Sequence, residues 1–281
     1  MNILIIGGTR FIGKAVVDSL SAFNLKFSVF SRNTGVSSHI NHIKGDRNNS
    51  QDLESINGNY DVIIDFISYN EKHTKEIIHL FPNSRYILIS TAWKKIEYSE
   101  KQELKFNYIQ NKRLAEEEVL KSREKNNKNT IIRLPIILGL NDHTNRTNFF
   151  RQFNNNQIYL TNPDSNIYFC WKSDISDFIV SQILSKDKHT PDVIYPPSYF
   201  NLKLSTYIEM HQNLETIKYE IKYIERSQMD KDQAFINYVN TIAEDFYYPI
   251  EIFGKSKMKI DKLDRLHLFM SSLRDKEPFL T

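Results

Sequence analysis

Three Tyr-x-x-x-Lys pairs give this sequence its clearest candidates for proton-transfer chemistry. They are Tyr108/Lys112, Tyr168/Lys172 and Tyr199/Lys203. A tyrosine with an ordinary pKa of about 10 is a poor acid or base at neutral pH, and a nearby lysine ammonium lowers that pKa by stabilising the tyrosinate. On a helix, residues four apart have Cβ atoms about 5–6 Å apart, whereas on a strand they lie about 13 Å apart. The pair that does this chemistry must therefore lie on a helix.

The sequence around Tyr108 meets this requirement best. The stretch NYIQNKRLAEEEVL predicts a long polar helix over about residues 108–123. Tyr168 instead lies in the strand-like stretch NIYFCWK, and Tyr199 follows two prolines. Tyr108 also has a candidate hydroxyl partner, Thr91, at the end of the preceding predicted strand. A threonine hydroxyl in that place can hold a substrate oxygen in line with the tyrosine.

A second candidate site is the stretch GGTRFIG at residues 7–13. It follows the apolar run of residues 2–6, and apolar residues recur at helical spacing from Phe11 onward. Glycines between a strand and a helix allow a tight turn, close approach of backbone N–H groups to a diphosphate, and close helix–strand packing. A plain tight turn is the alternative, but this order of elements favours a dinucleotide-binding loop. The expected cofactor contacts here are Gly7, Thr9, Arg10, Phe11, Ile12 and Gly13.

Two arginines bear on which dinucleotide binds. Arg10 takes the place of the usual middle glycine of the loop. NAD-binding proteins usually carry an acid about 20 residues further on, which accepts a hydrogen bond from the ribose 2′-hydroxyl, but this chain has Ser31 and Arg32 there. An arginine suits a 2′-phosphate through charge-assisted hydrogen bonds. The sequence therefore favours NADP(H) over NAD(H), with a solvated surface role for Arg32 as the alternative.

Alternating strands and helices must position these residues. Strand-like runs occur at residues 2–6, 26–30, 61–67, 86–90 and 130–133. Their alternation with helical segments predicts an α/β fold, a doubly wound parallel sheet of the Rossmann type with right-handed crossovers. We place a dinucleotide-binding domain at residues 1–165. Residues 166–281 would add the remaining elements of the sheet layer, a strand and then a helix from Asp174. They would end in a smaller C-terminal substrate-binding region that acts as a lid.

Composition narrows the class of protein. With 281 residues, 40% hydrophobic and 25% charged, the chain has the make-up of a globular protein. A net charge of +3 suits an anionic small molecule and is too weak for a dedicated nucleic-acid binder. The single Cys170 fits a reducing compartment, and no apolar run approaches the roughly 18 residues of a membrane span. We therefore expect a cytoplasmic protein with no membrane contact and no signal peptide.

Two other polar stretches are candidates for function. His39 and His42 form the only close histidine pair, in a stretch without further ligand types, so a solvated loop is favoured over a metal site. The run Glu116-Glu117-Glu118 is predicted to be a solvated helix face. Neither stretch adds a metal to the expected site.

Five short stretches occur in a characteristic order: GGTRFIG at 7–13, DR at 46–47, IST at 89–91, YIQNK at 108–112 and IRLPIILG at 132–139. Together they resemble the extended short-chain dehydrogenase/reductases, the NAD-dependent epimerase/dehydratase family that acts mostly on nucleotide sugars. The resemblance covers about residues 1–185. It implies a nucleotide-sugar substrate and a homodimer formed through paired long helices.

The resemblance also implies roles for individual residues. Tyr108 would be the general acid/base, Thr91 its hydroxyl partner, and Lys112 the residue that holds the nicotinamide ribose. His143 and Arg146 would approach the substrate, with Arg146 at a phosphate. The other implied cofactor contacts are Asp46 at the adenine, its neighbour Arg47, the lining residues Phe66, Ile67 and Ser68, and the backbone after Pro135.

Departures from the family pattern narrow the reaction. Ala92 and Trp93 stand where family dehydratases carry an Asp-Glu pair, and neither can transfer a proton. Ile136 replaces an asparagine that many nucleotide-sugar enzymes carry. We therefore expect an NADP(H)-dependent reductase of a keto group on a nucleotide-activated, deoxy sugar, in carbohydrate biosynthesis. Two alternatives stay open: an epimerase with bound NAD(P), and a non-catalytic RNA-binding member, since plastid RNA-binding proteins share the glycine loop.

Overall fold

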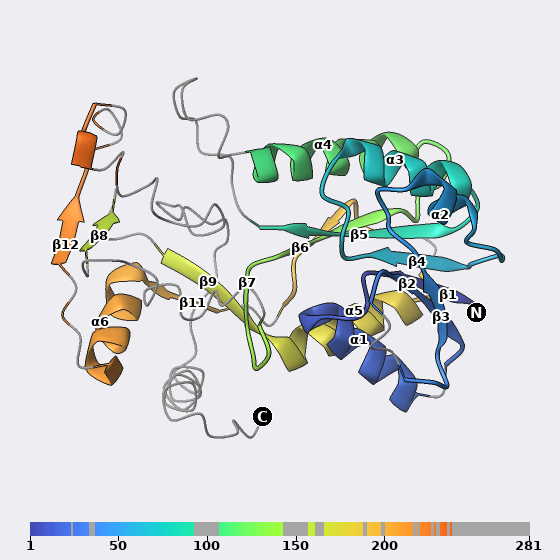
Figure 1. The fold of residues 1–281 in the computed structure, drawn as a ribbon, viewed down its shortest axis with the longest axis horizontal. Coiled ribbons are helices and arrows are strands. Elements are labelled where there is room, and N and C mark those ends of the chain that lie inside the picture. Colours follow the sequence, from blue (N-terminus) through green and yellow to red (C-terminus); the bar gives the residue numbers. More distant parts are fainter. Residues whose placement is uncertain are drawn as a thin grey trace. The chain divides into compact units, whose positions relative to one another are not determined.

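The computed structural model contains two compact units (Figure 1). The first unit is made of Met1–Ala92, Asn107–Leu134 and Trp171–Ser198, and the second takes in described residues between 135 and 170 and from 199 onward. The described residues are 1–23, 25–33, 37–92, 107–142, 157–160, 166–187, 190–197, 200–215, 218, 220–225, 228, 231–234 and 237.

A seven-stranded parallel sheet forms the centre of the first unit. Its strand order is β10-β6-β5-β4-β1-β2-β3, and every neighbouring pair is parallel. The strands are β1 (Ile3–Ile6), β2 (Phe27–Ser31), β3 (Asn41–Lys44), β4 (Val62–Asp65), β5 (Arg85–Thr91), β6 (Thr130–Leu134) and β10 (Val193–Ile194). The order reverses between β1 and β4, which confirms the predicted doubly wound α/β fold.

Helices cover both faces of this sheet (Figure 1). α1 (Phe11–Ala22) and α5 (Lys172–Leu184) pack together on one face, and α3 (Glu71–Leu80) and α4 (Asn107–Ser122) pack together on the other, near the short α2 (Ser50–Glu54). Alternate residues of the strands supply the two apolar faces, because side chains along a strand point to opposite sides. Leu4 and Ile63 thus share a buried cluster with Ile77 of α3 and Val119 of α4.

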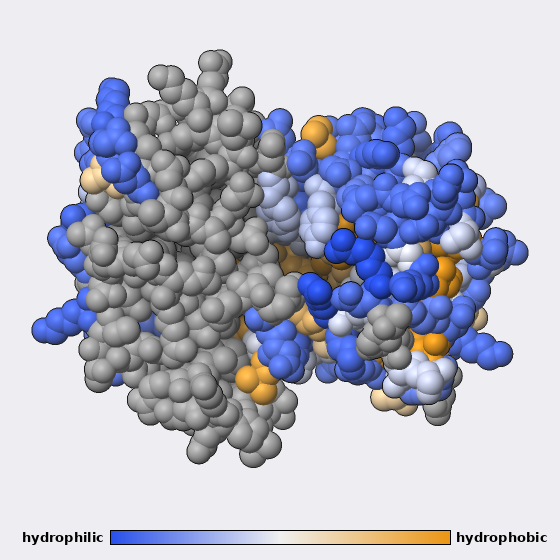
Figure 2. Space-filling model, viewed as in Figure 1, coloured by the Kyte–Doolittle hydropathy of each residue, from blue (hydrophilic) through white to orange (hydrophobic). Residues whose placement is uncertain are grey.

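The five predicted strands agree with this sheet, but its two edge strands, β3 and β10, were not predicted. The edge strand β3 was not predicted, because its side chains are exposed or half-buried and show no apolar run. His42 therefore lies in a strand, so the prediction of a loop was wrong for His42. α5 also begins at Lys172, two residues before the expected Asp174. On the face drawn in Figure 2, the described surface of the first unit is mostly hydrophilic.

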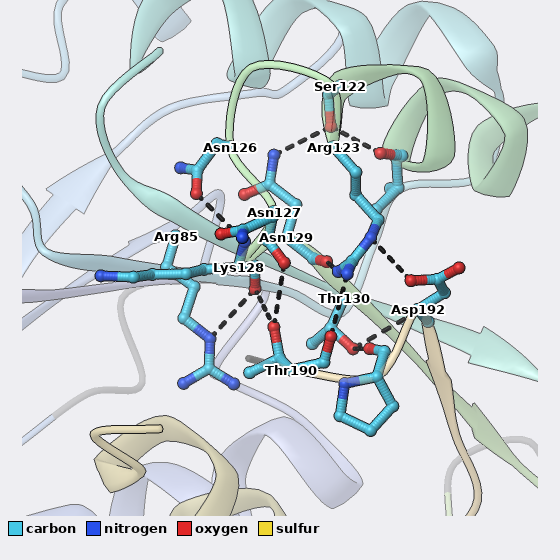
Figure 3. Close-up of polar contacts among 12 residues, drawn as sticks. Arg85, Ser122, Arg123, Asn126, Asn127, Lys128, Asn129, Thr130, Thr190 and Asp192 are labelled. Atoms are coloured by element: carbon cyan, nitrogen blue, oxygen red, sulfur yellow. Dashed lines mark hydrogen bonds and ion pairs between the residues drawn. The ribbon is translucent and has the colours of Figure 1, made fainter. Parts of the chain in front are cut away.

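Side chains, rather than strand length, fix the two-residue β10 at the edge of the sheet (Figure 3). Arg123, just after α4, lies 2.8 Å from the Asp192 carboxylate and donates to the backbone carbonyl of Thr190 at 2.9 Å. It also donates to the carbonyl of Asn129. The Thr130 hydroxyl donates to the Pro191 carbonyl at 2.6 Å. These bonds join the α4–β6 loop to the segment that enters β10.

The described residues of the second unit include two small sheets and the helix α6. A three-stranded sheet has the order β11-β9-β7, and β8 pairs in parallel with β12. The elements are β7 (Ile136–Leu138), β8 (Gln157–Leu160), β9 (Asn166–Trp171), β11 (Phe200–Lys203), α6 (Leu204–Glu215) and β12 (Glu220–Tyr223). Phe169 of β9 packs on Tyr207 of α6, with ring centroids 5.0 Å apart. Within the described part of the chain, no helix has the length and apolar composition needed to span a bilayer.

Candidate functional site

The glycine loop has the geometry of an anion cradle. Gly7 has φ +89°, a backbone conformation that side chains with a Cβ rarely adopt, and its N–H donates to the Phe30 carbonyl at 3.0 Å. A Cβ at Gly13 would overlap the Gly7 carbonyl oxygen, so only glycine allows α1 to start this close to β1. Arg10 is the N-cap of α1, and its side chain makes no capping hydrogen bond. The first N–H groups of α1 thus face the loop, as phosphate binding requires.

The loop after β4 lies against the glycine loop at the point where the strand order reverses. A Cβ at Gly7 would lie only 2.7 Å from Cγ2 of Ile67, and the Phe66 N–H donates to the Ile6 carbonyl at 3.0 Å. Ligands of open α/β sheets bind at this reversal. The structure therefore brings the expected residues Phe66 and Ile67 to the glycine loop. Ser68 is buried, and its hydroxyl bonds to that of Thr74 at 2.7 Å.

The ends of β2 and β3 hold the residues that bear on cofactor choice. Arg32 is exposed, and its Nη1 lies 3.6 Å from the Asp46 carboxylate. The Asn48 backbone N–H, with help from Arg32, holds the pKa of Asp46 below its usual range. Ser31 is buried: its hydroxyl donates to the Asn33 carbonyl at 2.9 Å and lies 3.0 Å from His42 Nε2. Arg32 and Asp46, 14 positions apart in the sequence, thus meet beyond the ends of neighbouring strands.

Arg47, expected at the cofactor, has its side chain turned into the protein. It is 3% exposed, lies 2.5 Å from the Asp65 carboxylate and donates to the His73 carbonyl at 2.7 Å. Burial alone would lower the Arg47 pKa, but Asp65 raises it above its ordinary value. The Tyr86 hydroxyl also donates to Asp65, at 2.9 Å. The guanidinium braces the loop that carries Asp46, so a cofactor contact would have to come from the Arg47 backbone.

The expected proton-transfer residues lie on α4 and at the end of β5, two elements that pack together. Tyr108 and Lys112 are one turn apart on α4, and Thr91 is the last residue of β5. Lys112 is 2% exposed and donates from Nζ to the Ile89 carbonyl of β5 at 2.9 Å. Tyr108 is 37% exposed, so its ring is open to a ligand. This arrangement can hold an ammonium beside a phenol at the carboxyl edge of the sheet.

Behind this pair lies a buried carboxylate that was predicted to face solvent. Glu116, one turn beyond Lys112, is 2% exposed. Its carboxylate pairs with Arg133 of β6 at 2.6 Å and with Arg113, and it accepts a hydrogen bond from the Ser90 hydroxyl. Arg113 in turn donates to the Thr91 carbonyl at 3.1 Å. The expectation of a solvated face was wrong for Glu116, because residues four apart share a helix face and Lys112 already points inward.

Other expected residues take scattered positions. Tyr168 is buried on strand β9, and Lys172 begins α5, so that pair does not share a helix. Lys172 Nζ lies 5.7 Å from the ring centroid of Phe11, next to the glycine loop, which its sequence context did not indicate. Pro135 separates β6 from β7. His143, Arg146, Trp93 and Tyr199 lie outside the described residues. Over the described ranges, no group of three His, Cys, Asp or Glu side chains is placed to hold a metal ion.

These features define a Rossmann-type fold with a tyrosine–lysine pair at the carboxyl edge of its sheet. No protein-family model and no curated protein matches the sequence. Solved structures share the fold. Pal from Bacillus thuringiensis has a TM-score of 0.63 at 16% identity, over 97% of this chain and 100% of that one.

Two further structures cover 80% of this chain. The UDP-glucuronic acid 4-epimerase of Bacillus cereus, solved with NAD, has a TM-score of 0.60 at 15% identity over 88% of its length. The NAD-dependent NDP-hexosamine 5,6-dehydratase TunA, of tunicamycin biosynthesis, has a TM-score of 0.60 at 14% identity over 85% of its length. At these identities the comparison establishes the shared fold.

Proposed function

We propose that the protein is an extended short-chain dehydrogenase/reductase that uses NADP(H) to reduce a keto group on a nucleotide-activated sugar. The observation that carries this proposal is the Tyr108–Lys112 pair on α4, a helix that packs against β5, the strand that ends at Thr91. Support comes from two fold neighbours, a nucleotide-sugar dehydratase and a nucleotide-sugar epimerase. The glycine loop supports the dinucleotide, because its close contacts leave no room for a Cβ at Gly13.

The side chains divide the work of reduction. A bound nicotinamide cofactor supplies the hydride. Tyr108 donates its phenolic proton to the carbonyl oxygen of the sugar, and the Thr91 hydroxyl holds that oxygen in line. The Lys112 ammonium stabilises the tyrosinate that remains and contacts the cofactor ribose. Arg113 and Glu116 keep the end of β5 fixed against α4.

NADP(H) is proposed because the end of β2 carries a cation and no acid. Arg32 can turn from Asp46 to a 2′-phosphate, since its side chain is 72% exposed and the ion pair is loose. Charge-assisted hydrogen bonds of this type contribute about 1.5–3 kcal/mol, or roughly tenfold or more in affinity. Arg32→Ala should therefore narrow the gap between NADPH and NADH affinity measured by fluorescence titration. Equal affinities in the unaltered protein would remove the basis for this preference.

A second candidate function is epimerisation of a nucleotide sugar with a retained dinucleotide. The observation in its favour is the fold likeness to the UDP-glucuronic acid 4-epimerase, whose structure contains NAD. Epimerisation would use the same Tyr108 and Lys112, first to remove a proton from a sugar hydroxyl and then to return it. The two functions differ in cofactor balance: reduction consumes NADPH, and epimerisation does not.

The test offers two substrates to the same protein. A dTDP-linked 4-keto-6-deoxyhexose with NADPH is followed by loss of absorbance at 340 nm, and UDP-glucose is followed by chromatography of its epimer. Tyr108→Phe should lower the active reaction by about two to four orders of magnitude, the usual range for a general acid. Phe23→Leu, which alters an exposed ring at the C-cap of α1, is the control and should not change the rate. Full activity of Tyr108→Phe would refute the assignment.

A further inference from the structure

Tyr69 presents an aromatic ring to the proton-transfer pair. It follows Ser68, just before α3. Its ring centroid is 6.4 Å from that of Tyr108, with the ring planes at 49°, and the Lys112 Nζ lies 5.2 Å from the same centroid. The interaction of an ammonium with an aromatic face is favourable at such distances. Tyr69 thus touches both members of the pair, from a different segment of the chain.

Hydrogen bonds fix the backbone that carries this ring. The Tyr69 N–H donates to His73 Nδ1 at 3.3 Å, and the His73 N–H donates to the side chain of the N-cap residue Asn70 at 2.9 Å. His73 Nε2 lies 3.1 Å from Oδ1 of Asn48, which requires a proton on Nε2 while Nδ1 accepts. Burial, with help from Arg47, lowers the His73 pKa and favours this neutral form. Tyr69 is therefore held by a turn that is itself fastened to α3.

The neighbours of the Lys112 ammonium include groups from two separate segments of the chain. They are the Ile89 carbonyl of β5 and the face of the Tyr69 ring. A lysine has four rotatable side-chain bonds, and confining its ammonium costs conformational entropy unless partners define its position. The carbonyl and the ring supply that definition before a ligand binds. Tyr69 itself remains 48% exposed, so its ring also borders the space open to a ligand.

We infer that Tyr69 is a positioning residue that holds the Lys112 ammonium beside the Tyr108 phenol. This inference rests on the proposed function of that pair in proton transfer. The aromatic ring is the part that acts, because the contacts run to its face and to the neighbouring ring. Tyr69→Phe should then preserve the effect, and Tyr69→Leu, which keeps an apolar side chain without a ring, should abolish it.

The direct readout is the ionisation of Tyr108, which needs no substrate. Phenolate absorbance at 295 nm is titrated in the full-length protein, and the curve for the Tyr108→Phe variant is subtracted. Without the Tyr69 ring the ammonium is less well placed to stabilise tyrosinate, so Tyr69→Leu should move the Tyr108 midpoint to higher pH. Tyr69→Phe should leave it in place. Turnover should fall about 2- to 30-fold in Tyr69→Leu, the equivalent of a cation–π contact of about 0.5–2 kcal/mol.

Controls separate this inference from the proposed function. Phe23→Leu removes an exposed ring from the C-cap of α1 and should alter neither the midpoint nor turnover. An unchanged Tyr108 midpoint in Tyr69→Leu would overturn the inference, as would a loss in Tyr69→Phe equal to that in Tyr69→Leu. If Tyr108→Phe itself retains full turnover, the proposed function fails instead. If Tyr69→Leu does not fold, Tyr69→Met takes its place with the same expected shift.

Discussion

Replacing Glu116 by glutamine tests the buried charge network most directly. The amide keeps the size of the side chain but removes the charge that Arg113 and Arg133 share. Loss of one partner of a buried ion pair costs about 3–5 kcal/mol. The two arginine side chains are 23% and 24% exposed and can partly rehydrate, so we expect about 3 kcal/mol, at the lower end of this range.

The assay is urea unfolding at pH 7, followed by far-ultraviolet circular dichroism. Glu116→Gln should unfold at lower urea than the unaltered protein. Glu117→Gln is the matched control, because Glu117 is the exposed neighbour on the same helix. Such an exposed substitution should change the free energy of unfolding by less than about 0.5 kcal/mol. Identical unfolding curves for the two variants would refute the assignment of Glu116 as a structural anion.

Comparing Glu116→Gln with the unaltered protein at several pH values tests the sign of the charge effect. Burial alone would raise the pKa of the Glu116 carboxyl, but Arg133, Arg113 and Ser90 together hold it below its ordinary value of 4.5. A depressed folded-state pKa means that the carboxylate stabilises the fold above the unfolded-state value, and that this stability is lost as the pH falls through the folded value. The stability gap between Glu116→Gln and the unaltered protein should therefore be full at pH 7 and shrink below about pH 4.5. A gap independent of pH would contradict this assignment.

Two other substitutions test the β10 edge of the sheet and the glycine loop. Arg123→Ala should lower the free energy of unfolding by about 2–3 kcal/mol, because the carbonyls of Asn129 and Thr190 and the Asp192 carboxylate lose their shared donor. Lys125→Ala, at an exposed neighbour, is the control and should change the free energy of unfolding little. Urea unfolding compares the two variants. Gly13→Ala should weaken NADPH binding at least tenfold in a fluorescence titration, because its Cβ overlaps the Gly7 carbonyl, and unchanged affinity would argue against the cradle.

The sheet was predictable from the sequence because its strands carry the pattern of complete burial. The runs at β1 and β4 are apolar on both faces, as a parallel sheet under two layers of helices requires. β3 carries the polar stretch Asn-His-Ile-Lys, and its edge position leaves it half-buried. Its pairing with β2 comes from backbone hydrogen bonds, which no side-chain pattern records. An edge strand of this kind is invisible to periodicity.

The site was predictable as far as local spacing reaches. Tyr108 and Lys112 are joined by helical geometry alone, so their proximity could be read from the sequence. Tyr69 could not be placed, because its contact with them depends on a separate turn meeting α4 across the carboxyl edge. Glu116 carried a usable signal, its four-residue spacing from Lys112, but the neighbouring glutamates concealed it.

One face of α4 shows how burial sets the job of each side chain. Tyr108, Lys112 and Glu116 follow at successive turns, and their exposed fractions are 37%, 2% and 2%. The first remains accessible, as its proposed exchange of a proton with a ligand requires. The second keeps its charge inside the protein because its ammonium contacts the Ile89 carbonyl and the face of the Tyr69 ring. The third is an anion that needs two arginines, and one of these, Arg113, returns to bind the Thr91 carbonyl. Thr91, whose hydroxyl is proposed to hold the substrate, is thus tied through its backbone carbonyl to the helix that carries the proposed proton donor, so a shift of α4 would displace both residues together.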